Sequence, residues 1–333
     1  MEILNTHTGG LVKQATTALD AVTPEALWLA NFTSENTRSA YQQAVGRFIA
    51  EMGLASSEEL YLVSQAHVVA WRERLREQGM SNASINQHLS ALSSLFKVLT
   101  DKQLCSHNPV SGVLRPGRGS REGGTGSGKT PALTARQVQR LLQAPLYLFD
   151  TRKPSELQRL RDHAVLALYF YTGARCSEPG RLKVKDLMLD RGYWVLRFKT
   201  KGEKINTVAI AAEEEETDSE CLGAIRAYLA ISGHADDAEA PLFLAIKYGQ
   251  NTGTALSRHA FYKLFKKYVR LAGLPDTFTP HSARSTFITQ AYDHGLQGED
   301  IQRTVGHASI TTTEAYNQSK RRLRKSASLG IRY

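Results

Sequence analysis

Apolar residues recur with the period of an α-helix through the first third of the chain. One predicted helix has an apolar face made of Tyr41, Val45, Phe48, Ile49 and Met52. A second is expected over residues 65–78, stopping at Gly79. A third begins near Ser81, and its apolar face is made of Ile85, Leu89, Leu92, Phe96 and Leu99. Residues 1–24 lack this periodicity, so the pattern predicts an N-terminal tail followed by a helical bundle over residues 25–112.

The periodic pattern stops after this bundle, and residues 113–130 are rich in Gly, Ser and Arg with little to bury. They are predicted to form a flexible basic linker. Structure resumes at Pro131, where Thr134 and Gln137 are suited to a capping box.

The rest of the chain, residues 131–333, is predicted to be a mixed α/β domain. A long apolar helix ends at Gly173, which suits a left-handed cap. Two alternating β-branched segments, 193–200 and 205–210, flank a short turn and predict a hairpin. After an acidic segment that begins at Glu213, the pattern predicts only helices, over 219–231, 256–272, 281–294, 298–305 and 309–318. The predicted fold class is therefore mainly α, with a small antiparallel sheet in the second domain.

Charge narrows the choice of partner. The 333 residues have a formal net charge of +10, which favours binding to a polyanion such as nucleic acid. Cys105, Cys176 and Cys221 are odd in number and without metal-binding spacing, so neither a disulfide framework nor a zinc site is expected. No long apolar run and no signal-peptide pattern is present, which predicts a cytoplasmic protein associated with the nucleoid, without a membrane partner.

One short motif matches a nucleotide-binding loop but lacks the sequence context that such a loop requires. Residues 123–130, Gly-Gly-Thr-Gly-Ser-Gly-Lys-Thr, match the phosphate-binding loop of nucleotide hydrolases. That loop works between a buried strand and the start of a helix. Here the preceding residues cannot form a buried strand, and Pro131 follows. We therefore expect no nucleotide site, and Lys129 is interpreted as a linker charge near DNA.

Four separated segments of the second domain resemble the signature of the tyrosine recombinase, or lambda-integrase, family. Residues 172–178, Thr-Gly-Ala-Arg-Cys-Ser-Glu, are similar to the family's T-G-x-R-x-x-E. Residues 201–204, Lys-Gly-Glu-Lys, are similar to its G-K-G-x-K turn. Residues 281–284, His-Ser-Ala-Arg, are similar to its H-x-x-R box. Residues 306–316 begin Gly-His, end in Tyr and keep the family's nine-residue step from histidine to tyrosine.

The segments depart from the family pattern at three positions. Thr200 stands where the family's turn has a leading glycine, and Val305 replaces a leucine before the fourth segment. Ser285 stands where many integrases have a histidine, a change that touches no catalytic role. The resemblance extends over residues 25–320, and the first domain is similar to the family's helical, SAM-like core-binding domain.

The resemblance implies a set of catalytic residues. These are Arg175, Lys201, His281, Arg284, His307 and Tyr316, with Glu178 in support and Lys204 as the alternative to Lys201. The residue types suit phosphodiester cleavage without a metal or another cofactor. Arginines stay charged and bind phosphate oxygens in pairs. A histidine can accept the tyrosine proton, and a lysine can protonate the departing oxygen.

By resemblance, the protein is expected to cleave and rejoin double-stranded DNA through a 3′-phosphotyrosine at Tyr316, as a homotetramer on two paired sites. Accessory DNA-bending proteins are possible partners, and the choice among integration, excision and resolution is open. The two-domain type of the Xer and Cre recombinases, without an arm-binding domain, is the nearer analogy. The alternatives are a type IB topoisomerase, a telomere-resolving enzyme and a DNA-binding regulator without catalysis.

Overall fold

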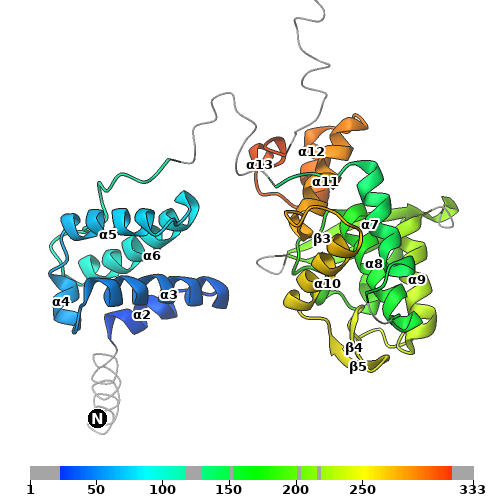
Figure 1. The fold of residues 1–333 in the computed structure, drawn as a ribbon, viewed down its shortest axis with the longest axis horizontal. Helices are drawn as coiled ribbons and strands as arrows, with labels where there is room; N and C mark the ends of the chain where they lie inside the picture. Colours follow the sequence, from blue (N-terminus) through cyan, green and yellow to red (C-terminus); the bar gives the residue numbers. More distant parts are fainter. Residues whose placement is uncertain (1–22, 118–129, 151–152, 201–203, 216–218, 317–333) are drawn as a thin grey trace, which may run out of the picture. The chain divides into compact units, whose positions relative to one another are not determined.

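The computed structural model describes residues 23–117, 130–150, 153–200, 204–215 and 219–316. The chain forms two compact units, Met1–Ser127 and Gly128–Tyr333. Helices dominate both units, and the strands form two small antiparallel sheets in the second, which confirms the predicted fold class (Figure 1). Among the described helices, none combines the length and apolar character that crossing a membrane requires.

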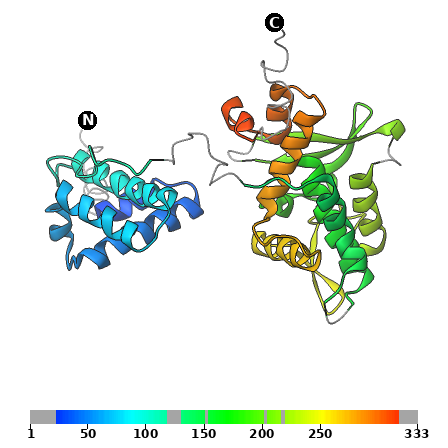
Figure 2. The ribbon, with the colours of Figure 1, turned by 45° about the horizontal axis from the view of Figure 1, so that its top comes forward.

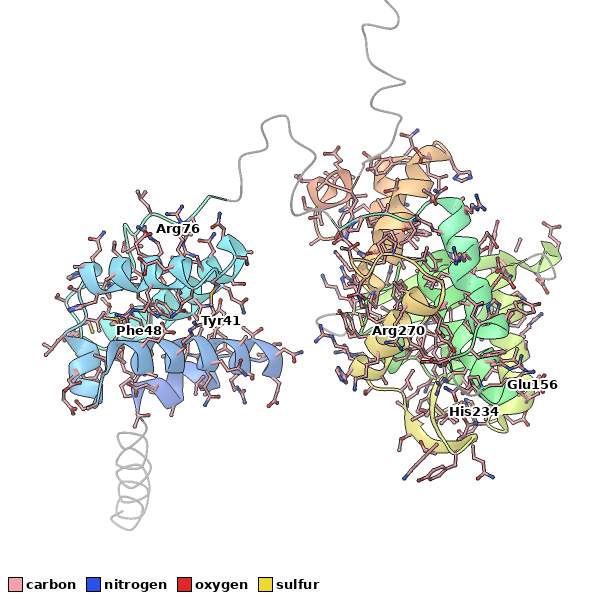
Figure 3. The ribbon with its side chains drawn as sticks, viewed as in Figure 1. Tyr41, Phe48, Arg76, Glu156, His234 and Arg270 are labelled. Atoms are coloured by element: carbon pink, nitrogen blue, oxygen red, sulfur yellow. The ribbon has the colours of Figure 1, made fainter. Side chains whose placement is uncertain are left out.

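The first unit is a bundle whose helices pack through the predicted apolar faces. Its helices are α2 (Pro24–Ala30), α3 (Glu35–Met52), α4 (Ser57–Tyr61), α5 (Gln65–Glu77) and α6 (Asn82–Asp101). The five apolar residues predicted for the third helix are all fully buried on α6. Phe48 of α3, labelled in Figure 3, meets Trp71 of α5 edge to face, with ring centroids 4.9 Å apart. Helical periodicity therefore located this core, because each helix buries only one face.

The second unit is built around one buried helix. Its helices are α7 (Ala135–Tyr147), α8 (Glu156–Thr172), α9 (Glu220–Ser232), α10 (Arg258–Leu271), α11 (Pro280–Asp293), α12 (Gly298–Val305) and α13 (Ile310–Glu314). Short 3-10 turns cover Pro179–Arg181, Val184–Asp186 and Glu213–Glu215. Most of α8 is inaccessible to solvent. As predicted, Thr134 and Gln137 form a capping box before α7, and α8 ends at Gly173 in the left-handed conformation.

Two antiparallel sheets complete this unit. Strands β1 (Leu187–Asp190), β2 (Tyr193–Lys199) and β3 (Ile205–Ala212) lie in that order, and β4 (Leu244–Lys247) pairs with β5 (Gln250–Ala255). The β2–β3 hairpin confirms the prediction. In both Figure 1 and Figure 2, α12 and α13 lie at one end of the unit and the β4–β5 hairpin lies at the opposite end.

The prediction that only helices follow the acidic segment was wrong. Residues 244–255 form the β4–β5 hairpin, which turns at Tyr248 and Gly249, both with positive φ. This conformation matches the twist of a tight hairpin. The pattern missed it because β5, Gln-Asn-Thr-Gly-Thr-Ala, is largely exposed and has no apolar alternation. The last predicted helix, 309–318, was also too long, since α13 ends at Glu314 and a turn follows.

The first described residues of the second unit are hydrogen-bonded to α11. Ser285 donates a hydrogen bond to the Thr130 carbonyl at 3.0 Å, and the Leu133 N–H donates to the Thr286 hydroxyl at 2.8 Å. Residues 118–129, which include most of the predicted linker and of the nucleotide-loop motif, lie outside the described residues. The next helix begins only at Ala135. This argues against a nucleotide loop, whose lysine and threonine lead directly into a helix.

Candidate active site

Tyr316 lies between two histidines of the second unit. Its hydroxyl is 2.6 Å from Nε2 of His281, an imidazole nitrogen that can accept the phenolic proton. The ring of His307 stacks on Tyr316 at 5.6 Å and 21°, while the ring of His281 meets it at 72°. Tyr316 is held by its backbone: its N–H donates to the Thr313 carbonyl, and its carbonyl accepts from the Thr289 hydroxyl. The geometry thus sets a potential nucleophile against a potential base.

The first turn of α11 presents His281 and Arg284 together. Thr279 and Ser282 form a capping box, and Pro280 occupies the first turn, where its missing N–H costs nothing. His281 and Arg284 are three residues apart and so share one helix face. The side chain of Arg284 is almost wholly buried, at 1% relative exposure. Its guanidinium donates to the carbonyls of Gly173, at 2.8 Å, and Val305, at 2.7 Å.

Arg175 follows the end of α8 and is held by Glu178. One carboxylate oxygen of Glu178 accepts from the Arg175 backbone N–H and the other from its guanidinium, both at 2.7 Å. The guanidinium also donates to the Gly306 carbonyl at 2.9 Å. Glu178 therefore fixes both the backbone and the charged end of Arg175.

Glycine allows these chain segments to approach. A Cβ on Gly173 would lie 2.8 Å from the ring of Phe287 and 3.2 Å from Val305, and the backbone there has a φ of +63°. Gly306 also has a positive φ, +64°, as the cap that ends α12. A larger residue at Gly173 would separate α8 from α11 and α12, and so move both arginines.

His307 is fixed by a partner that sequence reasoning missed. Its Nδ1 is 2.9 Å from the hydroxyl of Thr313, which is fully buried. Thr313 lies inside the fourth family-like segment, but three threonines stand in a row there, at 311–313. Their positions around α13 decide which of them faces His307. That choice was not visible in the sequence.

The predicted lysine, Lys201, lies outside the described residues. Lys204 is exposed beside the first residue of β3. The hairpin is closed at this point by Thr200, whose backbone N–H and hydroxyl both reach the Lys204 carbonyl, at 2.7 and 3.0 Å. The choice between Lys201 and Lys204 therefore stays a prediction.

A pocket of about 480 Å³ adjoins the site at His281. Arg258 and His259 line it from the first turn of α10, and Cys176 and Tyr262 line it too. Sequence reasoning assigned no role to Arg258 or His259. The sequence signal that could have pointed to them is a pair of basic residues directly after the Ser257 cap, at a helix N-terminus, where anions are favoured.

Solvent exclusion and positive charge determine the ionisation of the site. Burial lowers the pKa of His307 to about 4, with the charges of Arg284 and Arg175 adding to the effect. The pKa of His281 is lowered by the same causes. Burial raises the pKa of Tyr316, and the two arginines oppose that rise. Burial beside Arg175 lowers the pKa of Arg284 to about 10. At neutral pH the two imidazoles and the Tyr316 phenol are therefore neutral, and Arg284 keeps its charge.

These shifts predict how cleavage depends on pH. Below its lowered pKa, His281 is protonated and cannot accept the Tyr316 proton. The rate of single-turnover DNA cleavage should therefore stay constant as the pH is lowered past about 6.5, the usual pKa of histidine. It should fall at least tenfold once the pH drops below the lowered pKa of His281. His281→Gln should remove this dependence, whereas His294→Gln, at the exposed end of α11, should keep it. A wild-type rate that does not change down to about pH 4 would contradict the role of His281.

The lowered pKa values of the two histidines also make the stability of the fold depend on pH. A histidine with a lowered pKa binds a proton more readily in the unfolded chain, so its contribution to stability is present above about pH 6.5. That contribution is lost as the pH falls toward the folded pKa, which is about 4 for His307. Melting temperatures recorded at each pH therefore have to accompany the cleavage rates.

Comparison with known proteins identifies the class that this fold and site define. The model of the "Phage integrase family" matches residues 131–322, and that of the "Phage integrase, N-terminal SAM-like domain" matches residues 24–103. Tyrosine recombinase XerC of Roseiflexus castenholzii is 30% identical over 283 residues, which cover 85% of this chain and 83% of that protein. Tyrosine recombinase XerD of Oceanobacillus iheyensis is 27% identical over 294 residues, covering 87% of this chain and 90% of that protein.

Solved structures agree in fold. XerH site-specific recombinase bound to palindromic difH substrate matches with a TM-score of 0.65 and 21% identity, covering 88% of this chain and 79% of that one. A lambda integrase tetramer bound to a Holliday junction matches with a TM-score of 0.65 and 17% identity, covering 91% of this chain and 77% of that one. The chain belongs to the phage integrase family. It is a tyrosine recombinase, an enzyme of site-specific recombination.

Proposed function

We propose that the protein cleaves and rejoins double-stranded DNA through a 3′-phosphotyrosine formed by Tyr316. One observation carries this proposal: the Tyr316 hydroxyl is 2.6 Å from Nε2 of His281, in a unit that also holds Arg175 and Arg284. The nucleophile, its base and the cations are contributed by one chain, so each subunit would cleave with its own tyrosine. Among the recombinases of similar fold, XerH and lambda integrase are described as bound to DNA.

In the proposed cleavage step, the Tyr316 oxygen attacks the phosphorus and forms a new P–O bond as the bond from phosphorus to the 5′ oxygen breaks. His281 takes the phenolic proton, and a lysine of the β2–β3 hairpin gives a proton to the 5′ oxygen. The products are a 3′-phosphotyrosine and a free 5′ hydroxyl. Because the phosphotyrosine is still a phosphodiester, a 5′ hydroxyl from another strand can reverse the step. Rejoining therefore needs no ATP.

The two arginines would compensate the charge that builds up on phosphorus in the transition state. Each guanidinium has five N–H donors. The bonds to the Gly173, Val305 and Gly306 carbonyls and to Glu178 use part of each set, so donors remain for phosphate oxygens. Neutral His307, with Nδ1 held by Thr313, would donate from Nε2. These fixed donors provide the compensation that a metal ion supplies in other nucleases.

We place the general acid at Lys201, with Lys204 as the alternative. A departing 5′ alkoxide is a strong base, so a proton has to arrive in the transition state. The hairpin lies in the same unit as both arginines, and Lys201 and Lys204 lie in the sequence between its two strands.

Strand exchange requires two DNA sites, and we propose a homotetramer assembled on them, with accessory DNA-bending proteins where the reaction needs a direction. The lambda integrase of similar fold is described as a tetramer on a Holliday junction.

Residues 317–333 follow the nucleophile directly and could pack on a neighbouring subunit. An apolar pocket of about 550 Å³ between α7, α8 and α11, lined by Val138, Phe170 and Phe287 among others, could receive them. The site of action would be the nucleoid, where the DNA is.

The experiment that tests this function traps the covalent intermediate. Purified protein is incubated with sheared genomic DNA in EDTA without ATP, then denatured, and the protein-linked DNA is sequenced. We expect adducts at one recurrent sequence with two inverted half-sites, and pairing of two recovered sites by the native complex. Adducts that require added Mg²⁺ or ATP, or the absence of adducts in every buffer, would overturn the proposal.

Lys129→Ala should leave adduct formation near normal, because the nucleotide-loop motif has no role.

A further inference from the structure

The C-terminal end of α12 presents three consecutive backbone carbonyls, each bonded by a side chain from a different segment. The Thr304 carbonyl accepts from the side-chain amide of Asn206 at 2.8 Å. The next two carbonyls, of Val305 and Gly306, accept from Arg284 and Arg175 at 2.7 and 2.9 Å. Carbonyls at the end of a helix lack intrahelical partners and are free to take such bonds. Two of the three donors are the arginines of the active site, and the third is Asn206.

Asn206 belongs to the hairpin that bears Lys201 and Lys204. It lies on β3 opposite Phe198, one pair inward from the pair formed by Lys199 and Ile205. The hairpin is closed beyond that pair by the bonds from Thr200 to the Lys204 carbonyl. The Asn206 amide therefore ties the hairpin to the turn of chain whose carbonyls accept bonds from both arginines.

We propose that Asn206 is a positioning residue that sets the lysine hairpin in register with the arginines. The arginines fix where the phosphate binds, whereas the lysine has to reach the oxygen that leaves it. Asn206 and both arginines bond to residues 304–306, so loss of the Asn206 bond should displace the hairpin relative to the arginines. Misplacing a catalytic group by about 1 Å can cost about 10²-fold in rate. The proposal rests on the lysine general acid of the proposed function.

The test compares two DNA substrates that differ at one atom. Single-turnover cleavage is measured on the ordinary phosphodiester and on DNA with sulfur at the 5′ bridging position, which leaves without needing a proton. Asn206→Ala should cleave the oxygen substrate about 10- to 100-fold more slowly than wild type and recover most of its rate on sulfur. The sulfur-to-oxygen rate ratio should rise by a similar factor. This ratio is independent of the fraction of protein that is folded, so a loss of stability alone cannot raise it.

Asn251→Ala is the matched control. Asn251 is the corresponding kind of residue on the other hairpin, where its amide donates to the Ser232 carbonyl, and its sulfur-to-oxygen ratio should equal that of wild type. An unchanged ratio in Asn206→Ala overturns the proposal. If neither Lys201→Ala nor Lys204→Ala raises the ratio, the hairpin does not carry the acid and the proposal also falls. That result would leave the phosphotyrosine at Tyr316 standing, since failure of the phosphotyrosine would show as adducts that do not depend on Tyr316.

Discussion

Tyr316→Phe is expected to bind target DNA with wild-type affinity and to form no covalent adduct. The substitution removes only the hydroxyl that is 2.6 Å from His281. Its ring can still stack on His307, and both arginines keep their carbonyl partners, so the surface offered to DNA is unchanged. The measurement is a denaturing gel of protein with end-labelled DNA that carries a nick, which prevents rejoining and accumulates the adduct. The expected loss is complete, because nothing replaces the nucleophile.

A second tyrosine serves as the control for this result. Tyr171 lies at the end of α8, is 40% exposed and donates a hydrogen bond to Glu220 at 2.7 Å. Tyr171→Phe should form adducts at the wild-type level. Protein-linked DNA from Tyr316→Phe in wild-type amounts would show that another residue attacks, and the proposed mechanism would be wrong.

Lys201→Ala is expected to slow cleavage by roughly 10²–10⁴-fold, the range typical of a positioned general acid. With sulfur at the 5′ bridging position, the leaving group is a thiolate whose conjugate acid has a pKa of about 8.5. Such a group departs almost without help. The variant should therefore recover most of its cleavage rate on the sulfur substrate, measured under single-turnover conditions beside the oxygen substrate.

Two further variants decide how this result is interpreted. Arg175→Ala should stay impaired on both substrates, because compensation of charge at phosphorus is required whichever atom leaves. Lys204→Ala should be close to wild type on both. If sulfur restores only Lys204→Ala, the general acid lies three residues along the hairpin. If it restores neither lysine variant, the proton comes from another group and the assignment to the hairpin is wrong.

Short-range patterns predicted most of the fold. The buried face of α6, the capping box at Thr134 and Gln137, the left-handed Gly173 and the β2–β3 hairpin were all expected, because each depends on residues a few positions apart. The β4–β5 hairpin was not, since its strands are short and β5 buries little. Its place is decided by pairing and by the positive φ of Tyr248 and Gly249, which apolar spacing does not report.

At the site, the residue types could be predicted from the sequence. Arg175, Glu178, His281, Arg284, His307 and Tyr316 were chosen from short motifs, and the structure brings these six together in one unit. The structure sets the Tyr316 hydroxyl 2.6 Å from Nε2 of His281. Lys201 lies outside the described residues, so its place among them is still predicted.

The groups that hold these side chains in place come from distant parts of the chain and are visible only once it is folded. The partners of the two arginines are mostly backbone carbonyls, and a carbonyl looks the same at every position of a sequence. Arg175 and the Gly306 carbonyl are 131 residues apart, and Asn206 and the Thr304 carbonyl are 98 apart. No local pattern joins such pairs. They meet because α12 ends between α11, the turn after α8 and β3, and its last carbonyls, left without intrahelical partners, accept bonds from all three.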